Sequence, residues 1–337
     1  MTRSLFLFGW PSHYGGADTK FTDLVRLLCD SYSITVVPNF PLQLTQRAWR
    51  DFFETRRVRC CTLADLPDRL EGIALAVGND LFFASGICKA ARTKGLKIVW
   101  SVEMMWSHPG EVEAIRAGEV DRVLYVSEIQ KRHLDYERLG SLSTRITGNY
   151  VDPHPFPFVE RPARPFTIGR LSRAAPEKYP EDFPVFYEAL DLPDARFRVM
   201  AWSEELDAKY RWHRFGPRWE LLPPEGEDAF RFLASLDLFV YPLGHRFIES
   251  WGRSTVEAML TGLIPLVPPG HHLEKLILPG ETGFICDDFQ EYRRCATLLC
   301  QDTRLRKRMA QNARRHALRN LCDRAGHLKL WCEALDV

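Results

Sequence analysis

The sequence predicts an α/β protein with two Rossmann-like domains, and three observations lead to this prediction. A chain of 337 residues is longer than one hydrophobic core usually serves, so two domains are expected. Near-continuous apolar stretches alternate with amphipathic stretches of helical spacing, which is typical of parallel sheets covered on both faces. A proline-rich segment at residues 153–165, PHPFPFVERPARP, predicts a stiff extended connection between the two halves.

The apolar stretches predict strands, and the amphipathic stretches between them predict helices. In the first half, strands are expected at residues 4–10, 33–39, 57–61, 73–78, 97–102, 122–127 and 145–149, and helices at 17–30, 43–54, 81–95, 110–118 and 128–139. In the second half, strands are expected at 166–170, 196–201, 218–222, 237–241, 264–267 and 283–286, and helices at 181–190, 226–235, 253–262, 271–277 and 288–301. Basic helical segments follow from residue 303 to the end.

The composition excludes several classes of protein. Hydrophobic residues make up 45% and charged residues 26% of the chain, as in an ordinary globular protein. A net charge of +1 argues against a dedicated nucleic-acid-binding domain, which would carry a basic excess. No apolar run approaches the ~20 residues that span a bilayer. The short apolar stretch near the N-terminus is below the length of a signal peptide core and predicts the first buried strand.

The nine cysteines are odd in number, scattered, and located mostly in apolar runs. This pattern is typical of buried, reduced thiols, so we expect a cytoplasmic protein. No cysteine or histidine spacing matches a zinc site, and we expect no metal.

The most informative stretch is DLFVYPLGHRFIESWGRSTVEAMLTGLIPLV, residues 237–267. It predicts a buried strand, a loop carrying Glu249, a helix that begins near Gly252, and a second buried strand. The helix start would present main-chain N–H groups and a positive dipole end to a phosphate. Gly252 would allow close approach of the backbone, and Glu257 lies eight positions after Glu249 in the helix.

This segment resembles the Glu-x7-Glu motif of retaining GT-B glycosyltransferases, in particular those of glycosyltransferase family 4. The resemblance implies that Glu249 contacts the donor sugar near the reacting carbon and that Glu257 hydrogen-bonds the ribose hydroxyls. It also implies that the residues between them, Ser250, Trp251, Gly252, Arg253 and Ser254, lie along the sugar and phosphates of the donor.

A second segment, residues 166–190, is similar to the family's Gly-Arg-Leu…Lys element. A strand ends at Gly169 and Arg170, and the loop that follows carries Arg173 and Lys178. The resemblance implies that Arg170 and Lys178 bind the donor diphosphate, where cations stabilise the charge left by sugar–phosphate cleavage. Because the Arg–Lys spacing is two residues longer than the commonest form, Arg173 could replace either.

Three further regions are assigned by the same resemblance. The loop with Gly15 and Gly16 resembles the family's N-terminal Gly-Gly loop, which meets donor phosphates and acceptor, and it is not the G-x-G-x-x-G fingerprint of nicotinamide enzymes. Leu222 and Pro223 follow the strand whose backbone reads the nucleobase in relatives. Many relatives place a histidine after the fourth or fifth strand, where this chain has Glu103 and His108, either of which could touch sugar or acceptor.

The resemblance implies a GT-B architecture in which two Rossmann-like domains face each other across a cleft. We expect an acceptor-binding domain at residues 1–155, a donor-binding domain at 156–320, and a C-terminal helix at 321–337 that packs back on the first domain. The expected reaction moves a hexose from a nucleotide-diphosphate sugar, by default UDP-glucose, to an acceptor hydroxyl with retention and without a metal or other cofactor. Alternatives are a non-catalytic nucleotide-sugar-binding subunit, a GT-B epimerase and a phosphorylase.

The expected partners follow from this reading. The acceptor would be a glycan, a lipid-linked molecule or a small molecule, and the chain would be a monomer or weak dimer that binds no nucleic acid. The basic segment at residues 304–320 has few apolar residues, which favours a solvated face and at most a peripheral contact with anionic lipid.

Overall fold

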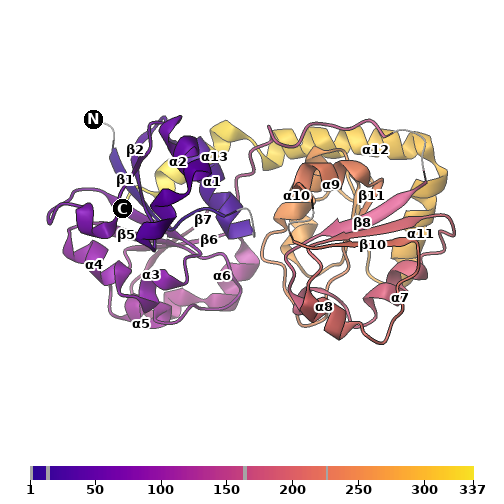
Figure 1. Cartoon of the computed structure of the whole chain (residues 1–337), viewed down its shortest axis with the longest axis horizontal. Helices are drawn as coiled ribbons and strands as arrows, with labels where there is room; N and C mark the ends of the chain where they lie inside the picture. The colour runs from indigo at the N-terminus through magenta and orange to yellow at the C-terminus, as the bar shows by residue number, and fades with distance from the viewer. Residues whose placement is uncertain (1–2, 13–15, 162–164, 225–226) are drawn as a thin grey trace. The chain divides into compact units, whose positions relative to one another are not determined.

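The structure is a computed structural model that describes residues 3–12, 16–161, 165–224 and 227–337 (Figure 1). The chain forms two compact units. The first unit comprises Met1–Tyr150 together with Arg324–Val337, and the second unit comprises Val151–Asp323. Each unit contains one parallel β-sheet with helices on both faces, so the predicted pair of Rossmann-like units is confirmed.

The sheet of the first unit has seven strands in the order β3-β2-β1-β4-β5-β6-β7, and every neighbouring pair is parallel. Apolar residues occupy both faces because a parallel sheet in this class is covered on both sides. In sequence order the strands are β1 (Arg3–Phe8), β2 (Tyr32–Val37), β3 (Arg59–Cys60), β4 (Ile73–Val77), β5 (Lys97–Ser101), β6 (Arg122–Tyr125) and β7 (Ser143–Ile146).

Alternate residues of β1 enter two different cores of the first unit. Leu5 and Leu7 pack in a core that also contains residues of α1, α2 and α13, whereas Phe6 and Phe8 pack in a core that contains residues of α3, α4 and α5. The helices of this unit are α1 (Gly16–Leu28), η1 (Pro41–Thr45), α2 (Arg47–Glu54), η2 (Leu63–Asp65), α3 (Leu81–Ala84), α4 (Ile87–Thr93), α5 (Glu111–Arg116), α6 (Glu128–Leu134), η3 (Tyr136–Leu139) and α13 (Arg324–Ala334).

The sheet of the second unit has six strands in the order β10-β9-β8-β11-β12-β13, again all parallel. Its strands are β8 (Thr167–Leu171), β9 (Arg196–Met200), β10 (Trp219–Leu222), β11 (Leu238–Val240), β12 (Pro265–Val267) and β13 (Phe284–Ile285). The order places β8 next to β11 and β11 next to β12. The carboxyl ends of these three strands therefore lie side by side at one edge of the sheet.

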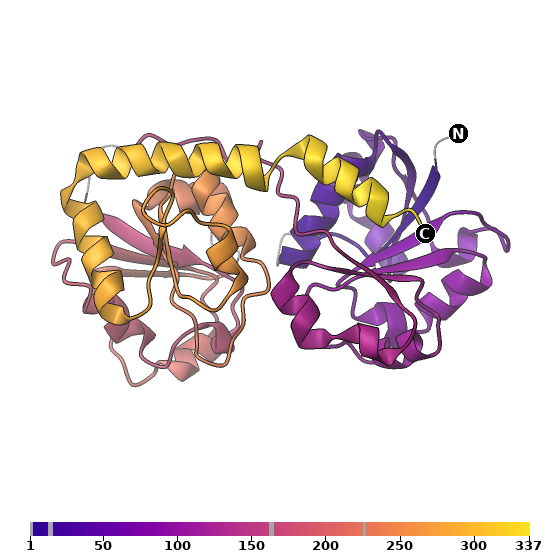
Figure 2. The ribbon, with the colours of Figure 1, turned by 180° about the vertical axis from the view of Figure 1, so that it is seen from behind.

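Helices cover both faces of the second sheet, as Figures 1 and 2 show from opposite sides. One core joins the sheet to α7, α8 and α11 and contains Phe183, Leu206 and Leu299, while α10 contacts α9, α12 and β12. The helices are η4 (Pro176–Lys178), α7 (Phe183–Glu188), α8 (Glu204–Lys209), α9 (Ala229–Ser235), α10 (Arg253–Leu260), η5 (His272–Lys275), α11 (Phe289–Gln301), α12 (Thr303–His316) and η6 (Ala317–Leu321).

The proline-rich segment follows the boundary between the two units at Tyr150 and Val151, and its later residues are anchored to the second unit. The main-chain N–H of Val159 donates to the carbonyl of Thr261 at 3.2 Å. The guanidinium of Arg161 donates to the carbonyls of Leu236 and Thr261 at 2.6 and 3.1 Å. Because these carbonyls cap the C-terminal ends of α9 and α10, the arginine charge lies where helix dipoles favour a cation.

Two helix predictions need correction, and one further helix was not predicted. The expected helix at 81–95 is divided into α3 and α4 by Gly86, whose φ of 75° only glycine adopts readily. The expected helix at 128–139 ends at Asp135, which has a left-handed φ of 47° and is followed by the short η3. Helix α8, which was not predicted, is held by burial of Leu206 rather than by an apolar repeat.

Two findings concern the whole described chain. No helix in residues 3–12, 16–161, 165–224 and 227–337 is long and apolar enough to cross a membrane. All nine cysteines lie in these ranges and have free thiols. The pKa values of Cys60 and Cys88 are raised to about 12 by burial, which keeps these two thiols protonated at neutral pH.

Candidate active site

The predicted donor residues of the second unit gather at the carboxyl ends of β8 and β11 and at the start of α10. β8 leads into the loop of η4, which carries Lys178, and β11 leads into the loop that carries Glu249. These two strands are direct neighbours, with Leu238 opposite Ile168. Strand order therefore brings together two segments that lie 71 residues apart in the chain. In open parallel sheets, ligands bind at this edge.

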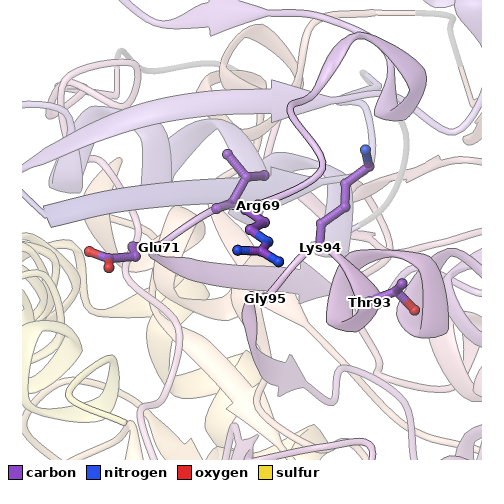
Figure 3. Close-up of a pocket in the computed structure, with 6 residues that line it drawn as sticks. Arg69, Glu71, Thr93, Lys94 and Gly95 are labelled. Atoms are coloured by element: carbon purple, nitrogen blue, oxygen red, sulfur yellow. The ribbon is translucent and has the colours of Figure 1, made fainter.

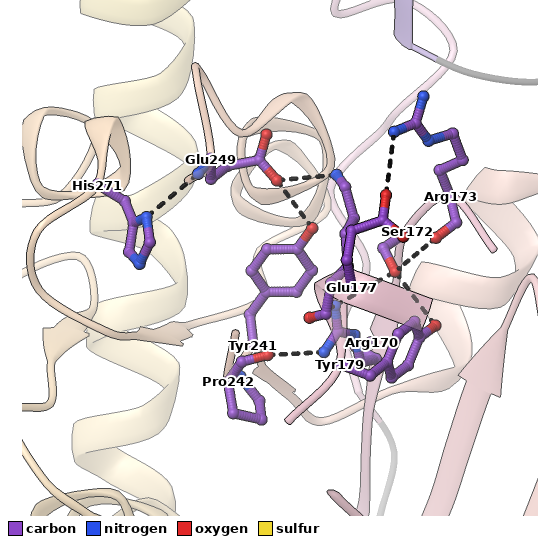
Figure 4. Close-up of polar contacts among 10 residues, drawn as sticks. Arg170, Ser172, Arg173, Glu177, Tyr179, Tyr241, Pro242, Glu249 and His271 are labelled. Atoms are coloured by element: carbon purple, nitrogen blue, oxygen red, sulfur yellow. Dashed lines mark hydrogen bonds and ion pairs between the residues drawn. The ribbon is translucent and has the colours of Figure 1, made fainter. Parts of the chain in front are cut away.

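Lys178 and Glu249 form a buried ion pair, and Figure 4 shows the contacts of Glu249. The ammonium Nζ of Lys178 lies 3.0 Å from Oε2 of Glu249, and their side chains are 13% and 10% exposed. The hydroxyl of Tyr241 donates to the same carboxylate oxygen at 3.2 Å. The ammonium also lies 4.8 Å from the centre of the Phe247 ring, a cation–π contact. One carboxylate oxygen thus accepts from both an ammonium and a phenol.

The pKa values of the pair shift in opposite directions. Burial alone would raise the pKa of Glu249, but the charge and hydrogen bond of Lys178 outweigh it and lower this pKa overall. Burial would lower the pKa of Lys178, and the charge of Glu249 reverses that and raises it. Burial also raises the pKa of Tyr241, which keeps the phenol protonated as a donor. The site is therefore an ammonium–carboxylate pair at neutral pH.

Arg170 lies in the interior of the second unit. Its side chain is completely buried, and its guanidinium donates to the carbonyl of Pro242 at 2.7 Å. The guanidinium carbon lies 4.0 and 4.4 Å from the ring centres of Tyr179 and Tyr241. It also donates to the carbonyl of Lys178 at 3.4 Å. In this arrangement Arg170 ties the two loops together from inside the unit and presents no surface to a diphosphate.

Arg173 is the accessible arginine of the same loop. Its side chain is 38% exposed, and its guanidinium lies 3.8 Å from Oε1 of Glu177, as Figure 4 shows. A partly exposed pair of this kind contributes little to stability and rearranges at low cost. Of the two arginines considered from the sequence, Arg173 is therefore the one that can reach a phosphate without repacking the core.

Two glycines allow the backbone geometry of this edge. A Cβ on Gly169 would lie 2.1 Å from the carbonyl oxygen of Arg198, so only glycine fits between β8 and β9 at that point. Gly252 precedes α10 with φ of 96°, and a Cβ there would lie 2.2 Å from Leu273. The chain thus enters α10 through a left-handed turn packed directly on η5.

The first turns of α10 hold a second acid–base pair. Nε of Arg253 donates to Oε1 of Glu257 at 2.8 Å, and the two side chains are 12% and 9% exposed. Trp251 is 5% exposed and stacks on His272 with ring centres 6.4 Å apart. Ser250 and Ser254 are half-buried beside them. The predicted ribose acid, Glu257, is thus restrained on α10, the helix that follows the loop of Glu249.

Leu222 and Pro223 lie at the carboxyl end of the edge strand β10. The carbonyl of Leu222 accepts from the main-chain N–H of Trp202 at 2.7 Å, and Pro223 is exposed. Their backbone is placed at the same edge of the sheet as the ion pair, two strands away from β8.

The remaining predicted site residues belong to the first unit. Gly15 lies outside the described residues, and Gly16 is the first residue of α1. Oε1 of Glu103 accepts from the ammonium of Lys20 at 2.6 Å, with side chains 5% and 0% exposed. Glu103 is thus committed to a buried ion pair. The ring of His108 packs edge-on against Trp100, and its main-chain N–H donates to Glu111 at 2.8 Å.

Sequence reasoning missed three residues of these clusters. Lys20 was assigned only to a helix, and Tyr241 only to a strand. His271 was assigned to a helix, but its Nδ1 accepts the main-chain N–H of Glu249 at 3.1 Å. A usable signal was present, because His271 comes shortly after the apolar run at 264–267 and polar residues at strand ends are candidate ligand contacts.

A pocket of about 410 Å³ lies in the first unit and is shown in Figure 3. It is lined by Arg69, Leu70, Glu71, Thr93, Lys94 and Gly95. These residues precede β4 and β5, so the pocket lies at the amino ends of the strands. Because ligands of parallel sheets bind at the carboxyl ends, we assign no donor contact to it.

The chain is similar to one protein family and to several solved structures. Residues 165–316, which hold the ion pair and α10, match the family model of glycosyl transferases group 1. HepE from Anabaena, solved with UDP and glucose, is 17% identical with a TM-score of 0.73, and 99% of each chain is covered. Sucrose-phosphate synthase from Thermosynechococcus elongatus is 13% identical with a TM-score of 0.70 over 98% of each chain. A glycosyltransferase from Rickettsia africae is 12% identical with a TM-score of 0.74 over 100% of each chain.

No curated protein sequence matches the chain. The structural likenesses extend over nearly the whole chain and show its fold, and the family match covers the unit that carries the ion pair. Residues 165–316 match the family of glycosyl transferases group 1, and the chain is a glycosyltransferase with the GT-B fold.

Proposed function

We propose that this glycosyltransferase transfers a hexose from a nucleotide-diphosphate sugar to an acceptor hydroxyl with retention of anomeric configuration and without a metal. The observation that carries the proposal is the contact of 3.0 Å between Lys178 and Glu249 beside the start of α10. It combines a cation, a carboxylate and a helix N-terminus, which are the groups needed to hold a diphosphate and an attached sugar.

The donor diphosphate would lie between Lys178, Arg173 and the N-terminus of α10. Lys178 supplies a point charge and Arg173 a planar fork, and both can neutralise charge on a departing phosphate. Glu249 would then exchange its contact with Lys178 for the hydroxyls of the sugar, while Glu257 would accept from the ribose hydroxyls. Arg170 holds the two loops that carry these groups.

The proposed chemical step is a front-face substitution. The bond between the anomeric carbon and the diphosphate oxygen breaks, and the nucleoside diphosphate leaves with its charge stabilised by the two cations. The acceptor oxygen forms the new bond from the same face, and its proton passes to the departing phosphate oxygen. No cofactor enters this step.

UDP-glucose is the default donor in this proposal. HepE, which has the same fold, was solved with UDP and glucose and with UDP-glucose. The acceptor would be a glycan, a lipid-linked molecule or a small molecule that carries a free hydroxyl.

A thermal-shift screen of nucleoside diphosphates and their sugars tests the donor class. A ligand present at 100 times its dissociation constant stabilises the folded state by about 2.7 kcal/mol, so a specific base is readily seen. Transfer from the best donor is then followed by NMR of the product's anomeric proton, with and without EDTA. Inversion, loss of rate in EDTA, or no turnover with any donor would each contradict the proposal.

A further inference from the structure

We propose that His271 is a positioning residue that fixes the direction of Glu249 by binding its main chain. This inference rests on the proposed function of Glu249. His271 follows β12 and precedes η5. Its Nδ1 accepts the main-chain N–H of Glu249 at 3.1 Å, as Figure 4 shows, and the main-chain N–H of His272 donates to the carbonyl of Glu249 at 3.3 Å. Two successive residues thus bind both polar main-chain groups of Glu249.

These two bonds matter because Glu249 lies in the loop between β11 and α10, where its main chain takes no part in the hydrogen bonds of the sheet or of α10. A buried main-chain N–H without an acceptor is destabilising, and Glu249 is only 8% exposed. With both main-chain groups bound, the Cα–Cβ bond of Glu249 has one direction. That direction places its carboxylate on Lys178 and Tyr241.

The segment that contains His271 supports the rest of the loop in the same way. His272 stacks on Trp251, and Leu273 packs where a Cβ of Gly252 would otherwise lie. The side chain of Leu273 is completely buried. Residues 271–273 therefore pack against residues 249–252, and the imidazole of His271 is the group that contacts Glu249.

The hydrogen bond also decides the proton position on the imidazole. A main-chain N–H can only donate, so Nδ1 carries a lone pair and the proton of the neutral ring is on Nε2. Burial lowers the pKa of His271, and the facing carboxylates of Glu249 and Glu274 raise it only in part. Burial together with the charge of Lys275 lowers the pKa of the neighbouring His272 to about 4. His271 is thus a neutral acceptor at pH 7.

Protonation of His271 would break this contact, because a second N–H would then face the N–H of Glu249. The loop would lose its support while Lys178 keeps its charge. The expected consequence is a fall in kcat at acid pH with little change in KM for the donor, since misdirection of one group near the reacting carbon acts on the transition state.

The test compares His271→Ala with His271→Asn in the full chain. The amide oxygen of asparagine can accept the same N–H without being able to gain a proton. We expect His271→Ala to reduce kcat by about 10- to 100-fold with KM changed less than about threefold, and His271→Asn to retain kcat within about threefold. We also expect His271→Asn to lose the acid fall of kcat. His133→Ala, an exposed residue of α6, is the control and should match the wild type.

A spectroscopic readout keeps this inference separate from the proposed reaction. Nitrogen-15 NMR of protein labelled at histidine should show the Nε2–H form of His271 at pH 7, whether or not any sugar is transferred. A protonated ring or the Nδ1–H form would overturn the inference, even with an active enzyme. An active wild type with unchanged kcat in folded His271→Ala, or a His271→Asn variant with the wild-type acid profile, would also overturn it. Absence of turnover in the wild type would count against the proposed function alone.

Discussion

The ammonium of Lys178 lies 3.0 Å from the carboxylate of Glu249, and each group stabilises the charged form of the other in a nearly buried site. In the proposed function, a donor diphosphate would compete with Glu249 for this ammonium. The pair would hold the cation in place before the donor binds and would leave the carboxylate available for the sugar afterwards.

Glu249→Gln should abolish sugar transfer while the fold is retained. The amide keeps the size of the side chain and can still accept from Tyr241, but it cannot offer a negative charge to the reacting sugar. We expect kcat to fall by at least about 100-fold, which corresponds to roughly 2.7 kcal/mol of transition-state stabilisation. Initial rates with the best donor, alongside circular dichroism, measure this. Wild-type rates in the variant would remove Glu249 from the site.

Lys178→Ala should weaken the binding of the nucleoside diphosphate by about 10- to 100-fold, because a charge-assisted contact to phosphate is lost. It should also cost about 3–5 kcal/mol of stability, since Glu249 remains buried without its cation. Isothermal titration calorimetry and urea unfolding measure the two effects. The double variant Lys178→Ala/Glu249→Ala should recover most of the stability and none of the affinity. A double variant that is no more stable than Lys178→Ala would mean that the two groups are not coupled.

The ion pair should make stability depend on pH at both extremes. The pKa of Glu249 is lowered from 4.5, so its contribution is complete above pH 4.5 and is lost as the pH falls through the folded-state value. The pKa of Lys178 is raised from 10.5, so its contribution is complete below pH 10.5 and is lost as the pH rises through its folded-state value.

The free energy of unfolding, measured by urea at a series of pH values, checks this dependence. The difference between the wild type and the Lys178→Ala/Glu249→Ala variant should be constant between pH 4.5 and 10.5 and should shrink outside that window. If this difference in unfolding free energy changes between pH 6 and 8, the pair is coupled to a further group with a pKa of about 6.5, the ordinary value for histidine.

Arg170 and Arg173 should respond to substitution in opposite ways. Arg170→Met removes the donors to Pro242 and Lys178 from a closed core, so we expect a loss of about 2–4 kcal/mol in stability and UDP affinity within about threefold of wild type. Arg173→Met changes a partly exposed side chain, so it should leave stability within about 0.5 kcal/mol and weaken UDP binding by about tenfold. A stable Arg170→Met protein with weak UDP binding would restore the role that the motif implied.

Gly252→Ala should destabilise the protein more than Gly280→Ala does. Both glycines have left-handed φ values, 96° and 76°, so both substitutions strain the backbone. Only at Gly252 does a Cβ meet another side chain, at 2.2 Å from Leu273, whereas nothing lies within 4 Å at Gly280. We expect an additional cost of about 1–3 kcal/mol at Gly252 in urea unfolding. An equal loss of stability in the two variants would show that Leu273 of η5 can shift to make room for the new Cβ without cost.

The sequence was sufficient for the architecture because the relevant signals are local. Runs of apolar residues bounded by turns predict each strand of both sheets. Successive residues of a strand, such as Leu5 and Phe6, enter the cores on opposite faces of the sheet. The breaks at Gly86 and Asp135 were missed, because a left-handed residue interrupts a helix without changing its apolar spacing. The short α8 was missed for the converse reason, since one buried leucine makes no repeat.

The candidate site was only partly predictable from local sequence patterns. Glu249, Lys178 and Gly252 lie in segments with a recognisable motif, so the sequence alone named them as candidates. Which of them meet depended on the order of strands in the sheet, because β8 and β11 are neighbours in the sheet but are separated by β9 and β10 in the sequence. Tertiary packing buries Arg170 and leaves Arg173 partly exposed, and the loop after β12 brings His271 to Glu249. The sequence thus determined the elements and the chemical groups, while tertiary packing alone decided partners and charge states, since both depend on distances and solvent exclusion between remote segments.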